Sequence, residues 1–254
     1  MKFSLNLNKI ALLRNARGEN NPSLEDYAHK AIDLGVDGLT LHPRPDHRHA
    51  TSNDVISLGR ICKDRDVEFN IEGNPFSKPS EPFKGYVNLV DICQPDQATL
   101  VPDLPNQITS DHGWESGGHD DDLSNVISNL NNLCKKTSIS LFVDSLKNQN
   151  TNLDSIDYAL KVRANTIEIH TGEFSKQIDN HEFTINDNLK ELIYKAKDKN
   201  LLVNAGHDLN LINLPHLTKI GGVNEVSIGH AIVVDALNYG FEDTIKRYIE
   251  VIKG

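Results

Sequence analysis

Cysteine is scarce in this 254-residue sequence. The three cysteines, at positions 62, 93 and 134, are odd in number, lie far apart and form no CxxC pair. A disulfide framework or a zinc knuckle needs cysteines in closely spaced pairs, so neither is expected. Reduced thiols are typical of the cytoplasm, and we therefore expect a cytoplasmic protein.

Long apolar runs and an excess of positive charge are also missing. Residues 1–9 alternate apolar with polar side chains, unlike a signal peptide, and no stretch is long enough to span a membrane. With 26 Lys and Arg against 36 Asp and Glu, the formal net charge is -10. A general nucleic-acid binder or a protein for anionic membranes needs a basic face, so we expect neither partner. A local cationic patch could still hold a small anion, and the candidates for it are Arg14, Arg17, Arg44 and Arg48.

Two nucleotide-binding motifs, GxGxxG and GxxxxGK[ST], are absent. Their absence argues against a dinucleotide-binding sheet or a phosphate loop. No segment rich in Gly, Ser or Pro divides the chain, and residues 1–254 are therefore predicted to form one domain.

What the sequence does contain is eight short β-type runs, separated by segments with helical signals. Ser23 to Asp26 resembles a capping box, for example, and Gly35 then fits a helix C-cap. Eight βα units in about 250 residues predict an α/β fold, a single (β/α)8 TIM barrel with extra helices, with an open doubly wound sheet as the alternative. The predicted strands are residues 3–8, 38–42, 67–72, 98–102, 138–144, 166–170, 201–205 and 225–228.

The segment HPRPDHRH, residues 42–49, follows the second predicted strand directly. Imidazole exchanges protons near neutral pH, and arginine binds phosphate or carboxylate with two parallel hydrogen bonds. Together they indicate proton transfer on an anionic substrate, and a solvated basic loop is the alternative interpretation.

Polar side chains recur at the carboxyl ends of the predicted strands, where barrel enzymes carry their active sites. Glu72 and Glu168 lie within otherwise apolar strands, where an unpaired carboxylate is costly. We predict that they perform acid-base work with raised pKa values, although a structural pairing is the alternative. His170 is interpreted as a core histidine.

A Gly-His pair follows each of the last two predicted strands, at residues 206–207 and 229–230. Glycine lets backbone amides approach a ligand, and a helix N-terminus attracts anions. This location predicts a phosphate cradle, with ordinary turn glycines as the alternative.

Six short segments are distinctive when taken together and in order. They are NKIALLRNARG (8–18), HPR (42–44) with His49, NIE (70–72), IEIHTG (167–172), VNAGH (203–207) and IGHA (228–231). As a set they resemble the pyridoxine 5'-phosphate synthase family over nearly the whole chain. The resemblance implies a transferase of vitamin B6 biosynthesis that condenses 1-deoxy-D-xylulose 5-phosphate with 3-amino-2-oxopropyl phosphate. Ring closure would release phosphate and water and would need no metal or organic cofactor. The resemblance also implies that the protein assembles as a homo-octamer.

The resemblance also implies roles for individual residues. It makes His42 and Glu72 proton acceptors and His207 a proton donor, and Glu168 corresponds to a transition-state stabiliser. The implied substrate-binding residues are Arg44, His49 and Thr109 for the sugar phosphate, and Asn6, Arg17, Asp208, Gly229 and His230 for the amino-ketone phosphate.

The chain departs from the family pattern at three positions. The family often carries Asp-His where this chain has Asn8 and Lys9, and often Gly where it has Asp208. Asn8 can still hydrogen-bond to a substrate and remains a predicted substrate-binding residue, but it cannot act as a base. Lys9 keeps a cation without titrating near neutral pH.

Three other functions stay open at this point. A metal-dependent barrel hydrolase could use the HxH pair at 47–49 with His170, His207 and Glu168, although the neighbouring arginines would repel a metal. A class I aldolase needs a buried lysine, for which Lys9 is the candidate near a strand end. A non-catalytic phosphosugar-binding barrel needs the arginines and glycines but neither glutamate.

Overall fold

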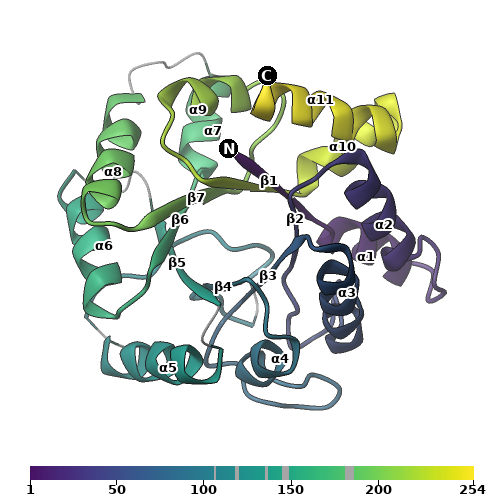
Figure 1. The fold of residues 1–254 in the computed structure, drawn as a ribbon, viewed down its shortest axis with the longest axis horizontal. Helices are drawn as coiled ribbons and strands as arrows, with labels where there is room; N and C mark the ends of the chain where they lie inside the picture. Colours follow the sequence, from purple (N-terminus) through teal and green to yellow (C-terminus); the bar gives the residue numbers. More distant parts are fainter. Residues whose placement is uncertain (106, 118–119, 135–136, 145–148, 181–185) are drawn as a thin grey trace.

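Eight parallel strands close into a barrel in which each strand pairs with its sequence neighbours and β8 returns to β1 (Figure 1). The computed structural model describes residues 1–105, 107–117, 120–134, 137–144, 149–180 and 186–254. The predicted (β/α)8 barrel is confirmed, and the open sheet is wrong. The strands are β1 (Lys2–Asn6), β2 (Gly38–Leu41), β3 (Glu68–Gly73), β4 (Gln97–Leu100), β5 (Ser138–Asp144), β6 (Thr166–His170), β7 (Leu202–Gly206) and β8 (Glu225–Ile228).

Helices form the outer layer around the strands (Figure 1). Their number exceeds the eight of a minimal barrel, as predicted, because extra helices occur near both ends of the chain and after β6. Within the described residues they are α1 (Asn8–Asn15), α2 (Leu24–Leu34), α3 (Ser52–Arg65), α4 (Tyr86–Cys93), α5 (Asp120–Leu133), α6 (Gln149–Lys161), α7 (Gly172–Asp179), α8 (Asn186–Asp198), α9 (Leu214–Ile220), α10 (His230–Tyr239) and α11 (Phe241–Lys253).

Local sequence signals explain several element ends. The Ser23 hydroxyl accepts a hydrogen bond from the amide of Asp26 at 3.2 Å, and Gly35 ends α2 with φ 97°, as the sequence predicted. The first strand was predicted to run to residue 8 but ends at Asn6, because Asn8 already begins α1. The other strand ends differ from prediction by at most two residues.

The barrel interior is mainly polar, with Phe142 of β5 as an apolar exception, whereas most apolar side chains of the strands face the helices. Facing interior residues are joined by hydrogen bonds: Ser4 and Thr40 hydroxyls lie 2.7 Å apart, and the Asn204 amide donates to Gln97 Oε1 at 2.8 Å. The outward residues of the same strands, such as Leu39 in β2, are fully buried under helices. Polar groups can fill this interior because they bond to one another, and they lead up to the carboxyl ends of the strands.

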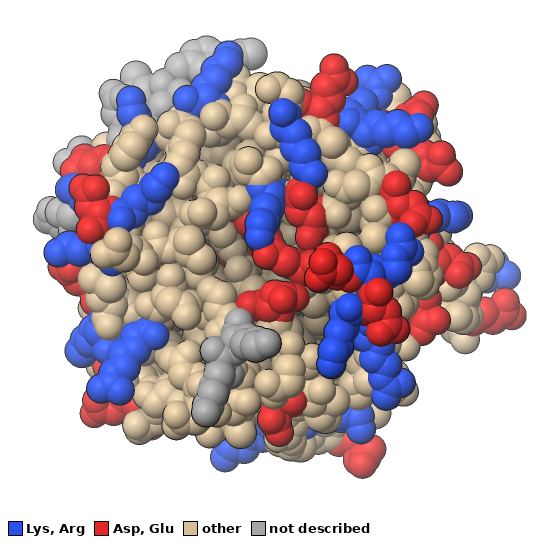
Figure 2. Space-filling model, in the orientation of Figure 1, with Lys and Arg blue, Asp and Glu red and all other residues tan. Residues whose placement is uncertain are grey.

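Acidic and basic side chains are interspersed on the face of the barrel seen in Figure 2, and acidic ones reach its centre. That face therefore offers a mixed rather than a basic surface. In the described part of the chain, no helix is both long and apolar enough to cross a membrane.

Candidate active site

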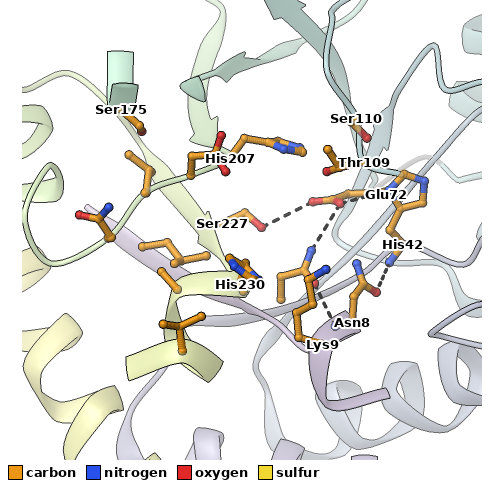
Figure 3. Close-up of a pocket in the computed structure, with 18 of the residues that line it drawn as sticks. Asn8, Lys9, His42, Glu72, Thr109, Ser110, Ser175, His207, Ser227 and His230 are labelled. Atoms are coloured by element: carbon orange, nitrogen blue, oxygen red, sulfur yellow. Dashed lines mark hydrogen bonds and ion pairs between the residues drawn. The ribbon is translucent and has the colours of Figure 1, made fainter. Parts of the chain in front are cut away.

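A cavity of about 710 Å³ opens at the carboxyl ends of the strands (Figure 3). All but one of the predicted site residues line the cavity: Asn6, Asn8, His42, Arg44, His49, Glu72, Thr109, Glu168, His207, Asp208, Gly229 and His230. The exception is Arg17, which is exposed after α1 and is not among the lining residues, so its role stays a prediction.

His42 stands between two carboxylates. Its Nδ1 lies 3.6 Å from Oε2 of Glu72, and its Nε2 lies 3.3 Å from Oδ2 of Asp103. Burial lowers the pKa of His42 to about 4, against the opposing pull of Asp103. The imidazole is therefore neutral near pH 7 and can accept a proton.

Glu72 is held at the end of β3 by weak hydrogen bonds. The Ser227 hydroxyl lies 3.5 Å from one of its oxygens and the Asn6 amide 3.5 Å from the other. Burial, helped by the charge of Asp103, raises the pKa of Glu72 to about 7. A carboxyl group with this pKa exchanges protons readily at neutral pH, which is what a general base requires.

Glu168 lies deeper in the barrel, on β6. The Thr99 hydroxyl is 3.2 Å from its Oε2, and burial followed by the charge of Glu72 raises its pKa well above the usual value. A Cβ atom on Gly206 would lie 2.6 Å from Oε1 of Glu168, so the neighbouring strand leaves room for this carboxyl group only with glycine there.

His207 follows β7 with φ 78°, an unusual conformation for a residue with a side chain. The Thr171 hydroxyl lies 2.6 Å from the His207 carbonyl oxygen, which ties this turn to the end of β6. The ring packs 5.1 Å from those of both Phe142 and His170. Burial lowers the pKa of His207 to about 3, so the ring is neutral near pH 7. His170, predicted to be a core histidine, is partly buried and lies 3.6 Å from Asp144.

Arg44 supplies a buried cation at the cavity wall. Its Nη2 donates to Oδ2 of Asp103 at 2.5 Å, and the Ser110 hydroxyl donates to the same oxygen at 2.9 Å. Nε of Arg44 is buried without a partner among the described atoms. A buried donor of this kind is satisfied when an anion or a water molecule accepts from it.

Gly229 is the N-cap of helix α10 and lies at the cavity wall. A Cβ atom there would lie 2.7 Å from the carbonyl oxygen of Asn6, so this close approach of β1 and β8 requires glycine. The next residue, His230, is exposed at the first position of the helix. The positive end of α10 therefore faces the region where the sequence predicted a phosphate.

Asn8 and Lys9 occupy the cavity beside the end of β1 (Figure 3). The Asn8 side chain accepts a hydrogen bond from the backbone amide of His42 at 3.0 Å, so it fixes the backbone of this catalytic candidate. Among the described residues, the Lys9 side chain makes no hydrogen bond or ion pair. It is a half-buried cation available to a ligand.

Asp103 is the site residue that the sequence reasoning missed. It lies three residues after the end of β4, and its position directly after the predicted strand 98–102 was the available signal. Two arginines of the predicted cationic patch also have other partners, because Arg14 pairs with Asp54 and Arg48 with Asp46.

In the described part of the chain, no three His, Cys, Asp or Glu side chains gather as a metal site.

The fold and the cavity define an α/β-barrel enzyme that works by acid-base catalysis on a small anionic substrate. The chain belongs to the family of the pyridoxal phosphate biosynthesis protein PdxJ, whose model matches residues 3–254. It is 41% identical to the pyridoxine 5'-phosphate synthase of Cytophaga hutchinsonii, with 99% of each chain covered. It is 40% identical to that of Xylella fastidiosa (strain 9a5c), covering 99% of this chain and 94% of that one. The resemblance read from the sequence is therefore confirmed.

Solved structures of low sequence identity share the barrel fold. Tryptophan synthase from M. tuberculosis matches with a TM-score of 0.61 at 8% identity, covering 100% of this chain and 93% of that one. Thiamine phosphate pyrophosphorylase from Pyrococcus furiosus matches with a TM-score of 0.58 at 11% identity, covering 99% and 95%. At this identity the match concerns the fold alone.

Proposed function

We propose that this chain is a pyridoxine 5'-phosphate synthase. It condenses 1-deoxy-D-xylulose 5-phosphate with 3-amino-2-oxopropyl phosphate and closes the pyridine ring with release of phosphate and water. The observation that carries the proposal is the buried pair of Glu72, with a pKa near 7, and neutral His42, 3.6 Å apart at the mouth of the cavity.

Proton transfers account for most of the chemistry. The amine of one substrate forms the imine with the carbonyl group of the other, so the reaction itself supplies the nucleophile and needs no cofactor. In this mechanism His42 and Glu72 accept protons as carbon-carbon bond formation and dehydration proceed. Burial raises the pKa of Glu168 and favours its protonated form, which acts as a hydrogen-bond donor that stabilises the charge developing in the transition state.

His207 is the proton donor in this proposal. Because burial lowers its pKa to about 3, the ring is neutral near pH 7 and takes up a proton as substrate binds. The negative charge of a substrate phosphate nearby favours the imidazolium form and raises that pKa. The donor is then charged only when a substrate is present.

Substrate binding divides between the two sides of the cavity. Arg44, His49 and Thr109, with Asn8, hold the sugar phosphate on the side of β2 and β4. Asp208 and the pair Gly229 and His230, with Asn6 of the neighbouring β1, hold the amino-ketone phosphate on the side of β7, β8 and β1. Arg17 lies outside the cavity lining and is assigned to the same substrate by the family resemblance alone. The unpaired Nε of Arg44 and the glycine-lined start of α10 support these two assignments.

The chain is further proposed to act as one domain of residues 1–254 in a cytoplasmic homo-octamer. Pairing of β1 with β8 joins the two ends of the chain in one sheet, which supports the single domain. Leu237 on α10 is 83% exposed and Tyr239 is 47% exposed, and exposed apolar side chains of this kind favour contact with another copy. Light scattering coupled to size exclusion measures the mass and tests the octamer.

The decisive experiment mixes chelator-treated protein with both substrates and follows pyridoxine 5'-phosphate by absorbance and mass. We expect product from the native chain and none above background from Glu72→Gln, while calorimetry shows that the variant still binds the sugar phosphate. Hydrolysis of a substrate that depends on added metal, without pyridoxine 5'-phosphate, would favour the metal-dependent hydrolase instead. Unchanged product in Glu72→Gln would remove the central role of this carboxylate.

A further inference from the structure

The last two residues of α1, Arg14 and Asn15, bind the loop that carries His49. The Asn15 side-chain amide donates to the carbonyl oxygens of residues 47, 48 and 49 at 3.3, 3.2 and 2.8 Å. Nη2 of Arg14 lies 3.5 Å from the carbonyl oxygen of His49. Three successive carbonyl groups of an irregular loop are thus held from one helix end.

Arg14 is itself held by a two-pronged ion pair. Its two Nη atoms donate to the two carboxylate oxygens of Asp54 at 2.5 and 2.8 Å. Its Nε and Nη2 also donate to Oδ1 of Asn15 at 3.1 and 3.0 Å. Both charged side chains are largely buried, 12% and 13% exposed, which makes this pair stronger than a surface salt bridge.

Asp54 extends this network to helix α3. Its carboxylate accepts hydrogen bonds from the amide and the hydroxyl of Thr51, the N-cap of that helix, at 2.7 and 2.8 Å. The network therefore joins the end of α1, the loop 47–49 and the start of α3. It also neutralises the charge of Arg14, so this arginine is not free to bind a substrate anion.

The orientation of the His49 ring depends on the same loop. The amide of Ala50 donates to Nδ1 of His49 at 2.9 Å, so the neutral ring carries its proton on Nε2. The ring is buried and lines the cavity. If the carbonyl of His49 moved, the adjoining amide of Ala50 would move with it and the ring would lose its fixed tautomer and direction.

We propose that Arg14, Asn15 and Asp54 are positioning residues, which hold the Nε2–H donor of His49 in place for the sugar-phosphate substrate. The inference rests on the proposed function, because it takes His49 as a residue that binds that substrate. The three residues do not touch the cavity themselves and act through the loop.

Two variants test the role through kinetics. Asn15→Ala removes the three carbonyl contacts, and the double variant Arg14→Gln with Asp54→Asn removes the ion pair without leaving one charge unpaired. For each, we expect the KM for 1-deoxy-D-xylulose 5-phosphate to rise about tenfold, with kcat changed less than about threefold. The KM for the amino-ketone phosphate should stay the same. Arg65→Gln, which breaks the exposed pair with Asp33 at the other end of α3, is the matched control and should change neither constant.

A second readout does not depend on activity. Hydrogen exchange of the unliganded protein, followed by mass spectrometry, should be faster in the peptide covering residues 44–52 in both variants and unchanged in the strands and in Arg65→Gln. If the variants exchange faster in this peptide but the native chain forms no product, the synthase function is rejected, whereas the role of Arg14, Asn15 and Asp54 in holding the loop is retained. The inference is overturned if folded Asn15→Ala has the same hydrogen-exchange rates and the same KM values as the native protein. It is also overturned if the KM values for both substrates rise equally. If Asn15→Ala does not fold, the double variant decides the question by the same criteria.

Discussion

At the scale of single residues, burial at the barrel mouth acts in opposite directions on the two proposed bases. It disfavours the charged form of each, so it raises the pKa of Glu72 to about 7 and lowers that of His42 to about 4. An imidazole and a carboxyl group placed side by side would otherwise form a permanent ion pair. Here the imidazole stays neutral, and the carboxyl group gains and loses its proton near the working pH.

This arrangement predicts a pH dependence. Glu72 accepts a proton only when ionised, so kcat/KM should fall as the pH drops through about 7. The Ser227 hydroxyl donates to the carboxylate and favours its charged form, so Ser227→Ala should move the acid limb to higher pH by less than about one unit. Steady-state rates measured between about pH 5.5 and pH 9 give the shift, in buffers of constant ionic strength so that charge screening stays the same. Ser140→Ala, which removes a buried barrel hydroxyl without a hydrogen-bond partner among the described atoms, should leave the limb in place. A limb that moves down in Ser227→Ala would contradict the assignment to Glu72.

Gly206 is the second residue-scale prediction. An alanine methyl group would lie 2.6 Å from Oε1 of Glu168, so Gly206→Ala must displace the carboxyl group, whose other oxygen contacts Thr99. We expect a loss of stability of about 1–3 kcal/mol together with a fall in kcat. Urea unfolding and steady-state kinetics measure the two effects. Gly59→Ala in α3 is the control, because its added methyl group would make an ordinary contact of 3.4 Å with the Phe69 ring. It should change the stability and kcat little.

At the scale of elements, the cap of α2 should contribute to stability and not to the chemistry. The Ser23 hydroxyl satisfies one of the free amides at the start of this helix, on the outside of the barrel. Ser23→Ala should therefore lower the free energy of unfolding by about 1 kcal/mol, with kcat and both KM values unchanged. Urea titration gives the first quantity. A Ser23→Asp variant, which restores a capping oxygen, should recover most of the loss, and failure to recover would show that the cap is not the cause.

Local signals of this kind are the part of the fold that the sequence reveals directly. The cap at Ser23, the left-handed Gly35 and the eight strand-helix alternations depend on neighbouring residues, and they were predicted within a few positions. Side-chain pairing between distant segments is different in kind. Asp103 meets Arg44 across 59 positions and was missed, and Arg14 meets Asp54 across 40, so Arg14 was wrongly counted among the arginines free for an anion. The motifs located the cavity wall well, since twelve of thirteen predicted site residues line it, but not the network behind it.

At the scale of the whole molecule, buried carboxyl groups occupy both ends of the polar barrel interior. Glu168 lies near the cavity, and Glu225 lies at the opposite end, where β8 pairs with Lys2 of β1. Burial, followed by the charges of Glu68 and Glu168, raises the pKa of Glu225 to about 8, although Lys2 opposes this. The closed barrel therefore holds a proton on a group that would ionise at about 4.5 in the unfolded chain.

This bound proton predicts how stability changes with pH. A carboxyl group with a raised pKa in the folded protein favours folding below its unfolded pKa, and the advantage is lost as the pH rises through the folded value. Stability relative to a Glu225→Gln variant, which cannot ionise, should therefore fall between pH 5 and pH 8 by roughly 1–4 kcal/mol. Urea unfolding of both proteins at these two pH values measures the difference, and Glu242→Gln on the exposed side of α11 serves as the control with a pH-independent difference. A constant difference between native protein and Glu225→Gln would mean that Glu225 is already ionised at pH 5, with Lys2 as its partner.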